Sequence, residues 1–372
     1  MFETRLRIIC FAANPTSSAT IQARILPLMS ELIKKGNHVT LVSPVVDRVS
    51  FSKVLVRGFK CGRRRPPSLL FPLFYIVMIL YSVACLAEPY DVVIASKNTY
   101  MSGILGMAFS SFKRIPLVTD IDDYEFSTSF YHHLLLKEPI ARAITTKSTA
   151  LVVASKALFR LYSERRQCRY IPNSTDLDFF SPRNVTSRRG YTLVWVGTFF
   201  FLSEWRLVLS SFARVRVPAI LVMIGDGPDL VLAKELVAML GISERVIFTG
   251  ELDRKSIREH LADADVGLVP LGDTLFNTCK CPIKLFEFMA MELPIIGTDV
   301  GEVGAMIREA RCGLASAPRA ESIAESIECV LKNFAGWQEA GKRGRIFLSR
   351  NQNWISLSRK YDELFQGLRL ST

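Results

Sequence analysis

One acidic residue stands inside an apolar stretch in the second half of the chain. The segment LFEFMAM (285–291) predicts an amphipathic helix, and Glu287 falls where such a helix buries apolar side chains. Lys284 precedes it by three residues, so the two charges share one helix face. Pro282 suits the first turn of a helix, because its missing N–H costs little there. We therefore expect a helix that begins near Pro282, with a carboxylate and an ammonium close to its amino end.

A second group of chemically useful side chains occurs in PLVTDIDDYEF (116–126), where four acidic residues follow a strand-like run. A carboxylate at a strand end can act as a general base or orient a hydroxyl. The alternatives are solvated loop acids or a cap for the next helix. His132 and His133 follow about ten residues later and are further acid–base candidates.

The elements that must position these groups alternate between strands and helices. The strands expected in the first half are 7–13, 38–44, 91–96, 116–121, 150–155 and 170–173, and those in the second half are 192–197, 219–225, 245–250, 266–270 and 294–299. Short β-rich runs separated by helices predict parallel sheets covered on both faces. We expect two doubly wound domains, 1–185 and 190–353, facing each other across a ligand-binding cleft. A last helix within 354–372 can cross back to the first domain.

The second half resembles family 4 glycosyltransferases of the GT-B fold. The resemblance is carried in order by WVG (195–197), VMIGDGPDL (222–230), RVIFTGELDRKSIREHLADADVGLVPL (245–271) and PIKLFEFMAMELPIIGTDVGEVGAMI (282–307). The segment IPNSTDLDFFSP (171–182) resembles the one before that family's domain linker. The resemblance implies two Rossmann-like domains and transfer of a sugar from a nucleotide-sugar donor, with retention of anomeric configuration and without a covalent intermediate.

The resemblance also implies roles for particular residues. Glu287 would accept hydrogen bonds from the donor ribose, and charge-assisted bonds of this kind are strong. The backbone N–H groups of Ile283 and Lys284 at the helix start, with the Lys284 ammonium, would face the diphosphate. The other donor-binding candidates are Gly197, Thr198, Arg206, Gly225, Gly250, Leu252 and Pro282.

Three positions depart from the family pattern. Cys279 stands where the family has the first glutamate of a Glu, seven residues, Glu motif, whose second glutamate matches Glu287. Thr198 and Ser203 replace an arginine and a lysine. In the first half, Asp122 aligns with a histidine that many relatives place near the reacting sugar. We assign Asp122 to orienting a sugar hydroxyl or assisting proton removal from the acceptor.

Charge is unevenly distributed, because residues 1–185 carry 24 Lys/Arg against 13 Asp/Glu while 186–372 carry 23 against 22. Seven basic residues and no acidic one lie between Arg48 and Ala87, and 68–87 carries no charge. Three structures fit 68–87: a buried or groove helix inside an α/β domain, an interfacial helix with Arg63, Arg64 and Arg65 on lipid phosphates, or a membrane span. We expect a cytoplasmic protein at the inner face of the membrane, acting on a lipid-linked or surface polysaccharide acceptor.

Other classes of protein fit less well. GDGP (225–228) lacks the third glycine of a dinucleotide fingerprint because Leu230 occupies its place, so an oxidoreductase is a weaker alternative. A non-catalytic nucleotide-sugar-binding protein of the same fold is a second alternative, because of the three departures. Cys279 and Cys281 have no second pair at metal-ligand spacing, and no metal or other cofactor is expected. The basic run adjoins an apolar stretch without interleaved aromatics, which argues against nucleic acid.

Overall fold

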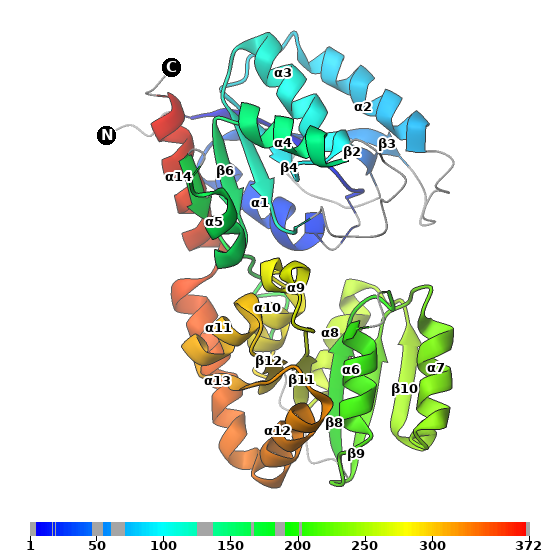
Figure 1. Cartoon of the computed structure of the whole chain (residues 1–372). Coiled ribbons are helices and arrows are strands. Elements are labelled where there is room, and N and C mark those ends of the chain that lie inside the picture. The colour runs from blue at the N-terminus through cyan, green and yellow to red at the C-terminus, as the bar shows by residue number, and fades with distance from the viewer. Residues whose placement is uncertain are drawn as a thin grey trace. The chain divides into compact units, whose positions relative to one another are not determined.

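The computed structural model describes residues 5–16, 18, 20–46, 55–60, 71–124, 137–164, 167–182, 190–200 and 203–369 (Figure 1). The chain forms two compact units. The first comprises Met1–Asn173, Cys279–Cys281 and Trp354–Thr372, and the second comprises Ser174–Thr278 and Pro282–Asn353. The second unit begins at Ser174, before the boundary at 185–190 expected from the sequence. Phe179 and Phe180 already belong to it, because both rings pack against Arg254 at the start of a second-unit helix.

The first unit is built on a seven-stranded parallel sheet with the order β3-β2-β1-β4-β5-β6-β7. Its strands are β1 (Arg7–Ala12), β2 (His38–Val46), β3 (Leu55–Lys60), β4 (Val92–Ser96), β5 (Leu117–Ile121), β6 (Ala150–Val153) and β7 (Gln167–Tyr170). Strand β3 was not expected from the sequence. The strand expected at 170–173 lies earlier, as β7, because Pro172 has no N–H to donate to a ladder.

Helices cover both faces of this sheet. They are α1 (Leu26–Lys34), which continues a π-helical turn over Ile21–Ile25, α2 (Phe71–Cys85), α3 (Leu105–Lys113), which continues a second π-helical turn over Tyr100–Ile104, α4 (Lys137–Lys147), α5 (Lys156–Tyr162) and α14 (Trp354–Arg369). One buried cluster joins α1 and α14 to alternate residues of β1, and another joins α2 and α3 to the intervening residues. This alternation is what a sheet buried on both faces requires.

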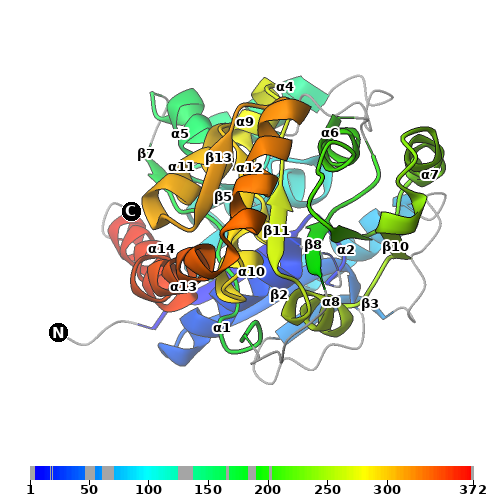
Figure 2. The ribbon, with the colours of Figure 1, turned by 90° about the horizontal axis from the view of Figure 1, so that it is seen from below.

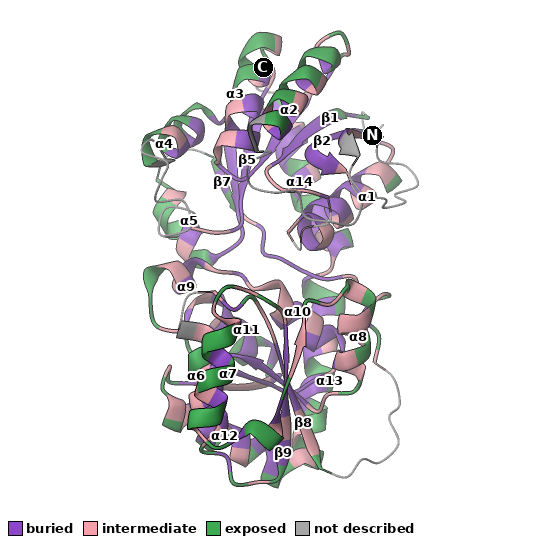
Figure 3. Ribbon diagram, turned by 90° about the vertical axis from the view of Figure 1, so that its right-hand side faces the viewer, coloured by how far each residue is buried: buried purple, intermediate pink, exposed green. Residues whose placement is uncertain are grey.

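Helix α2 lies on the sheet with one apolar face inward and another outward. Phe74, Met78 and Cys85 are buried against the sheet, whereas Leu80 and Val83 are 63% and 58% exposed. Figure 3 shows buried strands and exposed outer helix faces. Within the described residues no helix has both the length and the apolar character needed to cross a membrane. For the described part of 68–87, α2 packs as a helix inside an α/β unit, the first structure considered for this segment, and its outer face is exposed.

A buried ion pair lies in the core of the first unit. Arg24 and Asp120 are both about 1% exposed, and Arg24 Nη2 donates to Asp120 Oδ1 at 2.7 Å. The Arg24 guanidinium also donates to Asn173 Oδ1 at 2.9 Å and to the hydroxyl of Tyr361 at 3.0 Å. Tyr361 in turn donates to Asp120 Oδ2 at 2.7 Å. Arg24 therefore joins α14 to the end of the first-unit sheet through a fully hydrogen-bonded network, which is the condition under which a buried charge is tolerated.

The second unit contains a six-stranded parallel sheet with the order β10-β9-β8-β11-β12-β13. Its strands are β8 (Tyr191–Val196), β9 (Ala219–Ile224), β10 (Val246–Gly250), β11 (Val266–Val269), β12 (Ile295–Thr298) and β13 (Gly313–Ser316), of which β13 was not expected. Its helices are α6 (Ser203–Phe212), α7 (Leu230–Met239), α8 (Arg254–Ala262), α9 (Leu275–Cys279), α10 (Ile283–Ala290), α11 (Gly301–Ala310), α12 (Ala320–Lys332) and α13 (Phe334–Asn351), with a short 3-10 turn over Ser243–Arg245.

Right-handed crossovers decide which face of the second sheet each helix covers. Helices α6, α7 and α12 lie on one face, and α8 and α10 lie on the other (Figure 2). Strand order reverses between β8 and β11, so the loops after these strands diverge at the carboxyl edge. That is the edge at which open parallel sheets bind their ligands. Both sheets thus have the doubly wound architecture predicted from the alternation of strands and helices.

Candidate functional site

Helix α10 carries the carboxylate that the sequence singled out. It begins at Ile283, in agreement with the helix start expected near Pro282. Pro282 is its N-cap and makes no side-chain capping bond. Glu287 is half-buried one turn along, while its neighbours Phe286 and Phe288 are fully buried. Among the described residues the Glu287 carboxylate makes no hydrogen bond or ion pair. Its oxygens therefore keep their full capacity to accept hydrogen bonds from a ligand.

Burial sets the protonation behaviour of Glu287. It raises the pKa of Glu287 from 4.5 to about 7, and the positive charges of Arg254 and then Lys284 act in the opposite direction. A raised pKa means that the surroundings disfavour the charged form of the carboxyl group. Such perturbed carboxylates gather at functional sites, although structural networks also produce them.

Lys284 points toward the first strand and helix of the second unit. Its ammonium lies 3.6 Å from the Glu204 carboxylate of α6 and 4.9 Å from the centre of the Trp195 ring. These contacts fix the ammonium near the carboxyl end of β8, because Trp195 is the penultimate residue of that strand. Lys284 is thus held at the edge where the sequence places the donor phosphates.

Three predicted donor-binding glycines are brought together by hydrogen bonds between successive loops. Gly197 N donates to Ile224 O at 2.9 Å, and Gly225 N donates to Gly250 O at 2.9 Å. At Gly225 the φ angle is +135°, and an added Cβ would lie 1.8 Å from Gly197 O. Only glycine allows the loops after β8 and β9 to approach this closely. The second glycine of GDGP plays the same part, since a Cβ on Gly227 would lie 2.4 Å from Phe199 O.

The remaining donor-side candidates occupy the same edge. Thr198 is exposed in the loop after β8, and Leu252 is half-buried in the loop after β10. Arg206 is exposed in the first turn of α6, and its guanidinium carbon lies 5.5 Å from the centre of the Trp205 ring. Helix α6 begins at Ser203, whose side chain is not among those described. Arg206 therefore offers a positive charge from α6.

Asp122 lies in the first unit, directly after β5. It is buried, and its Oδ1 lies 3.3 Å from Lys97 Nζ, which also lies 3.5 Å from Asp123 Oδ2. Lys97 follows β4 with a φ angle of +79°, a conformation that costs energy for a residue with a side chain. Burial rules out the solvated-loop interpretation for Asp122. His132, His133 and Arg63 to Arg65 lie outside the described residues.

The two closely spaced thiols belong to the first unit. Cys279 packs with Ile121 and Leu151, and burial raises its pKa to about 11, with a further contribution from Asp123. Cys281 accepts a hydrogen bond from the backbone N–H of Asn173, with Sγ 3.4 Å from the nitrogen. Both thiols are buried, and the raised pKa keeps Cys279 protonated at neutral pH. At position 279 a neutral side chain thus stands where the resemblance implies a carboxylate.

Arg254 is a charged residue at this edge that the sequence reading missed. It is the first residue of α8, and Asp253 caps the helix by accepting a hydrogen bond from Ser256 N at 2.8 Å. The Arg254 guanidinium carbon lies 4.4 Å from the centre of the Phe179 ring. Nothing in DRKSIR (253–258) distinguishes Arg254 from the other basic residues. The one indication in the sequence is the pair Phe179 and Phe180, whose rings can stack on a guanidinium.

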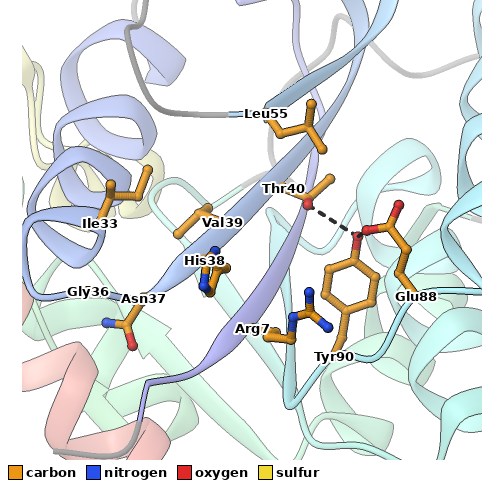
Figure 4. A pocket seen from close by; sticks show the side chains of 10 residues that line it. All are labelled: Arg7, Ile33, Gly36, Asn37, His38, Val39, Thr40, Leu55, Glu88 and Tyr90. Atoms are coloured by element: carbon orange, nitrogen blue, oxygen red, sulfur yellow. Dashed lines mark hydrogen bonds between the residues drawn. The ribbon is translucent and has the colours of Figure 1, made fainter.

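A hollow of about 380 Å³ opens at the opposite edge of the first-unit sheet (Figure 4). It is lined by residues that start strands, including Arg7 of β1 and His38 of β2, and the Tyr90 hydroxyl lies 3.2 Å from Thr40 Oγ1 and 3.1 Å from a Glu88 oxygen. Ligands of parallel sheets bind at the carboxyl ends of strands, and these are amino ends. This hollow is therefore not part of the candidate donor site.

The second unit is similar to a known protein family. The family model described as "Glycosyl transferases group 1" matches residues 190–333, which include β8, the glycine loops and α10. Over these residues the second unit is similar to group 1 glycosyltransferases. This unit holds Glu287 and Lys284, together with every donor-side residue predicted from the sequence.

Curated proteins similar to this chain carry the names of glycosyl-transferring enzymes. N-acetyl-alpha-D-glucosaminyl L-malate synthase of Bacillus anthracis is 30% identical over 156 residues, which are 41% of this chain and 39% of that protein. GDP-mannose-dependent alpha-(1-6)-phosphatidylinositol monomannoside mannosyltransferase of Mycobacterium tuberculosis is 26% identical over 215 residues, which are 53% of this chain and 55% of that protein. The chain thus spans between about two fifths and just over half of these relatives' lengths.

Solved structures resemble this chain over nearly its whole length. Sucrose-phosphate synthase from Thermosynechococcus elongatus superposes with a TM-score of 0.80 at 18% identity, covering 99% of this chain and 100% of that one. Anabaena Alr3699/HepE in complex with UDP-glucose superposes with a TM-score of 0.71 at 14% identity, covering 98% and 100%. The GT-B fold predicted from the sequence is confirmed.

Proposed function

We propose that this protein is a glycosyltransferase that moves a sugar from a nucleotide-sugar donor to an acceptor hydroxyl, with retention of anomeric configuration. The observation that carries the proposal is the Glu287 carboxylate, which has no hydrogen bond or ion pair to any described residue, one turn into α10 of a unit similar to group 1 glycosyltransferases. Its two oxygens can accept hydrogen bonds from both hydroxyls of a ribose. The unsatisfied N–H groups at the start of α10, together with Lys284, supply positive potential for a diphosphate.

The chemical step that we propose is the one that the family resemblance implies. The bond between the anomeric carbon and the donor phosphate breaks, and a bond from that carbon to the acceptor oxygen forms on the same face of the sugar. The acceptor proton passes to the leaving phosphate oxygen, so no protein nucleophile is needed. Charge that develops on the leaving diphosphate is stabilised by the α10 terminus and Lys284, so the step needs no metal ion. In the first unit we assign Asp122 to orienting the acceptor hydroxyl or assisting removal of its proton.

The donor test measures nucleotide binding by calorimetry. We expect the protein to bind UDP or GDP and the corresponding sugar nucleotide, because one similar protein is named a GDP-mannose-dependent enzyme and one similar structure is a complex with UDP-glucose. Glu287→Ala should weaken binding at least tenfold, about 1.4 kcal/mol, through loss of charge-assisted hydrogen bonds. An exposed glutamate on α7, Glu235, provides the matched Glu→Ala control and should leave the affinity unchanged.

Two outcomes would count against this assignment. If neither nucleoside diphosphate binds, or if Glu287→Ala binds as well as the parent protein, the donor site has been placed wrongly. If the sugar nucleotide binds but is never consumed in the presence of lipid-linked and saccharide acceptors, the non-catalytic alternative is correct.

We further propose that the first unit docks on an anionic membrane surface at the cytoplasmic face, where a lipid-linked or growing polysaccharide acceptor is available. The support is the outward apolar face of α2, in which Ile76, Leu80 and Val83 are each more than half exposed. It also includes the excess of basic residues in 1–185 and the basic run that holds Arg63, Arg64 and Arg65. Apolar side chains beside basic ones are typical of helices that lie in the membrane interface.

The membrane test is sedimentation with vesicles of phosphatidylcholine, with and without phosphatidylglycerol. We expect binding to the anionic vesicles that weakens with salt, because exposed charges are screened. Leu80→Glu/Val83→Glu should reduce binding at least tenfold, and replacement of Arg63 to Arg65 by glutamine should reduce its salt dependence. Ile346→Glu, at a 47% exposed position in the second unit, is the control. If vesicle binding is independent of salt and is unaffected by the substitutions on α2 and at Arg63 to Arg65, docking through this face is wrong.

A further inference from the structure

Arg254 is held by aromatic rings more than by hydrogen bonds. Its guanidinium carbon lies 4.4 Å from the centre of the Phe179 ring and 5.1 Å from that of Phe180. Its Nη2 is buried and has no hydrogen-bond partner among the described residues. Stacking on aromatic faces suits the planar guanidinium and leaves its charge available to a neighbouring group. This arrangement differs from a structural arginine such as Arg345, whose N–H groups donate to three carbonyl oxygens.

The stacking rings are fastened to the helix that carries Glu287. Arg345 of α13 donates to Phe180 O at 2.8 Å and to Ala290 O, at the last residue of α10, at 2.5 Å. Asp176 Oδ1 accepts from Phe179 N at 2.9 Å and so fixes the turn that presents the first ring. One arginine therefore joins the segment bearing the rings to α10.

The charges around Glu287 come from two helices on the same face of the sheet. Helices α8 and α10 lie on the same face of the second sheet (Figure 2). The positive charges that act on Glu287 are Arg254 on α8 and then Lys284 on α10 itself. Lys284 is already engaged with Glu204 and Trp195, whereas Arg254 responds to Glu287 first and to Asp176 second among its charged neighbours. Of the two carboxylates that act on the charge of Arg254, Glu287 has the larger effect and Asp176 the smaller.

We infer that Arg254 is a positioning residue for the donor site, whose positive charge favours the charged form of the Glu287 carboxyl group, the form that accepts hydrogen bonds from both ribose hydroxyls. The inference rests on the proposed function and adds a residue to it. Arg254 acts through Glu287 and need not touch the donor. The two phenylalanines hold the Arg254 guanidinium, and Arg345 ties their segment to α10. The positive electrostatic potential at Glu287 is therefore in place before the donor binds.

The test compares the pH dependence of UDP and GDP affinity between pH 5.5 and 9 in the parent protein and three variants. With Arg254→Gln, the pH at which affinity is half lost should rise by at least about 0.5 units, because a neighbouring positive charge has been removed. In this variant the nucleotide affinity at pH 6.5 should be at least threefold weaker than in the parent protein. At pH 9 it should match the parent protein, because Glu287 is ionised there even without the Arg254 charge. Arg254→Lys should restore most of the parent profile. Arg258→Gln is the matched control, since Arg258 contacts the same Phe179 ring at 4.8 Å.

A structural role would have a different signature. If Arg254→Gln weakens nucleotide binding equally at all pH values, or if Arg258→Gln shifts the profile as much, the inference is wrong. Titration of the carboxyl group of Glu287 by carbon-13 NMR in the ligand-free protein separates the two ideas. If the parent protein binds no nucleotide, the proposed function is wrong. If the titration midpoint of Glu287 is the same in Arg254→Gln as in the parent protein, the inference is wrong even when nucleotide binds.

Discussion

Arg24→Met is expected to lower the free energy of unfolding by about 3–5 kcal/mol, the range found when one partner of a buried ion pair is removed. The variant leaves the Asp120 carboxylate buried with only part of its hydrogen bonding, since Arg24 donates to both of its oxygens. It also removes the donors to Asn173 and to the carbonyl of Ile171. Urea denaturation at pH 7 measures the loss directly.

A second variant separates the charge effect from packing. In Arg24→Met/Asp120→Asn the uncompensated carboxylate is gone, so part of the stability should return. Lys34→Ala on α1 is the surface control, because the Lys34 ammonium is 67% exposed where it pairs with Glu31. That change should cost no more than about 0.5 kcal/mol. A loss below about 1 kcal/mol for Arg24→Met would show that this network contributes little to the fold.

Glu287→Gln is expected to stabilise the protein at pH 8 by up to about 3 kcal/mol and to leave its stability at pH 4 unchanged. Burial raises the pKa of Glu287 from 4.5 to about 7 in the folded state. Below pH 4.5 the carboxyl is protonated in both states and costs nothing. As the pH rises toward 7 the unfolded chain releases the proton first, so the folded state becomes progressively less stable. The neutral amide avoids this cost at every pH.

The measurement is the urea-unfolding free energy at pH 4, 6 and 8 for the parent protein, Glu287→Gln and Glu235→Gln. The control position is exposed on α7 and should change stability by no more than about 0.5 kcal/mol at any pH. A Glu287→Gln variant that is equally stabilised at pH 4 and pH 8, or destabilised at pH 8, would mean that the carboxylate is compensated in the folded state. A stabilised variant that has lost nucleotide affinity would identify Glu287 as a residue kept at a cost in stability.

The sequence predicted most of the fold because apolar strands alternate with helices throughout both halves. It missed β3, because LVRGFK mixes charges and a glycine with few apolar residues, and β13, because GLAS is short and has little β character. Both are strands at the end of their sheets, where one neighbour is enough. Edge strands need less apolar patterning than central ones, and this is why pattern alone did not find them.

The candidate site divides in the same way. Glu287 could be predicted because a carboxylate inside LFEFMAM conflicts with its local pattern, and such conflicts are expected at functional positions. Arg254 could not, because an arginine at the start of a polar helix conflicts with nothing. Its electrostatic effect on Glu287 depends on the crossover from β10 to β11, which places α8 on the same face of the sheet as α10. Tertiary topology of this kind is not encoded in any local spacing.

The return of α14 to the first unit has a consequence for biosynthesis. Leu357, Tyr361 and Leu364 complete a core that otherwise consists of residues before Asn173. At about 5–20 residues per second, a ribosome needs roughly 10–40 s to make the intervening chain. During that time the growing first unit exposes the apolar surface that α14 later covers. We therefore expect the second unit to reach its native state first on the ribosome, and the earlier half to depend on chaperone protection until the last helix emerges.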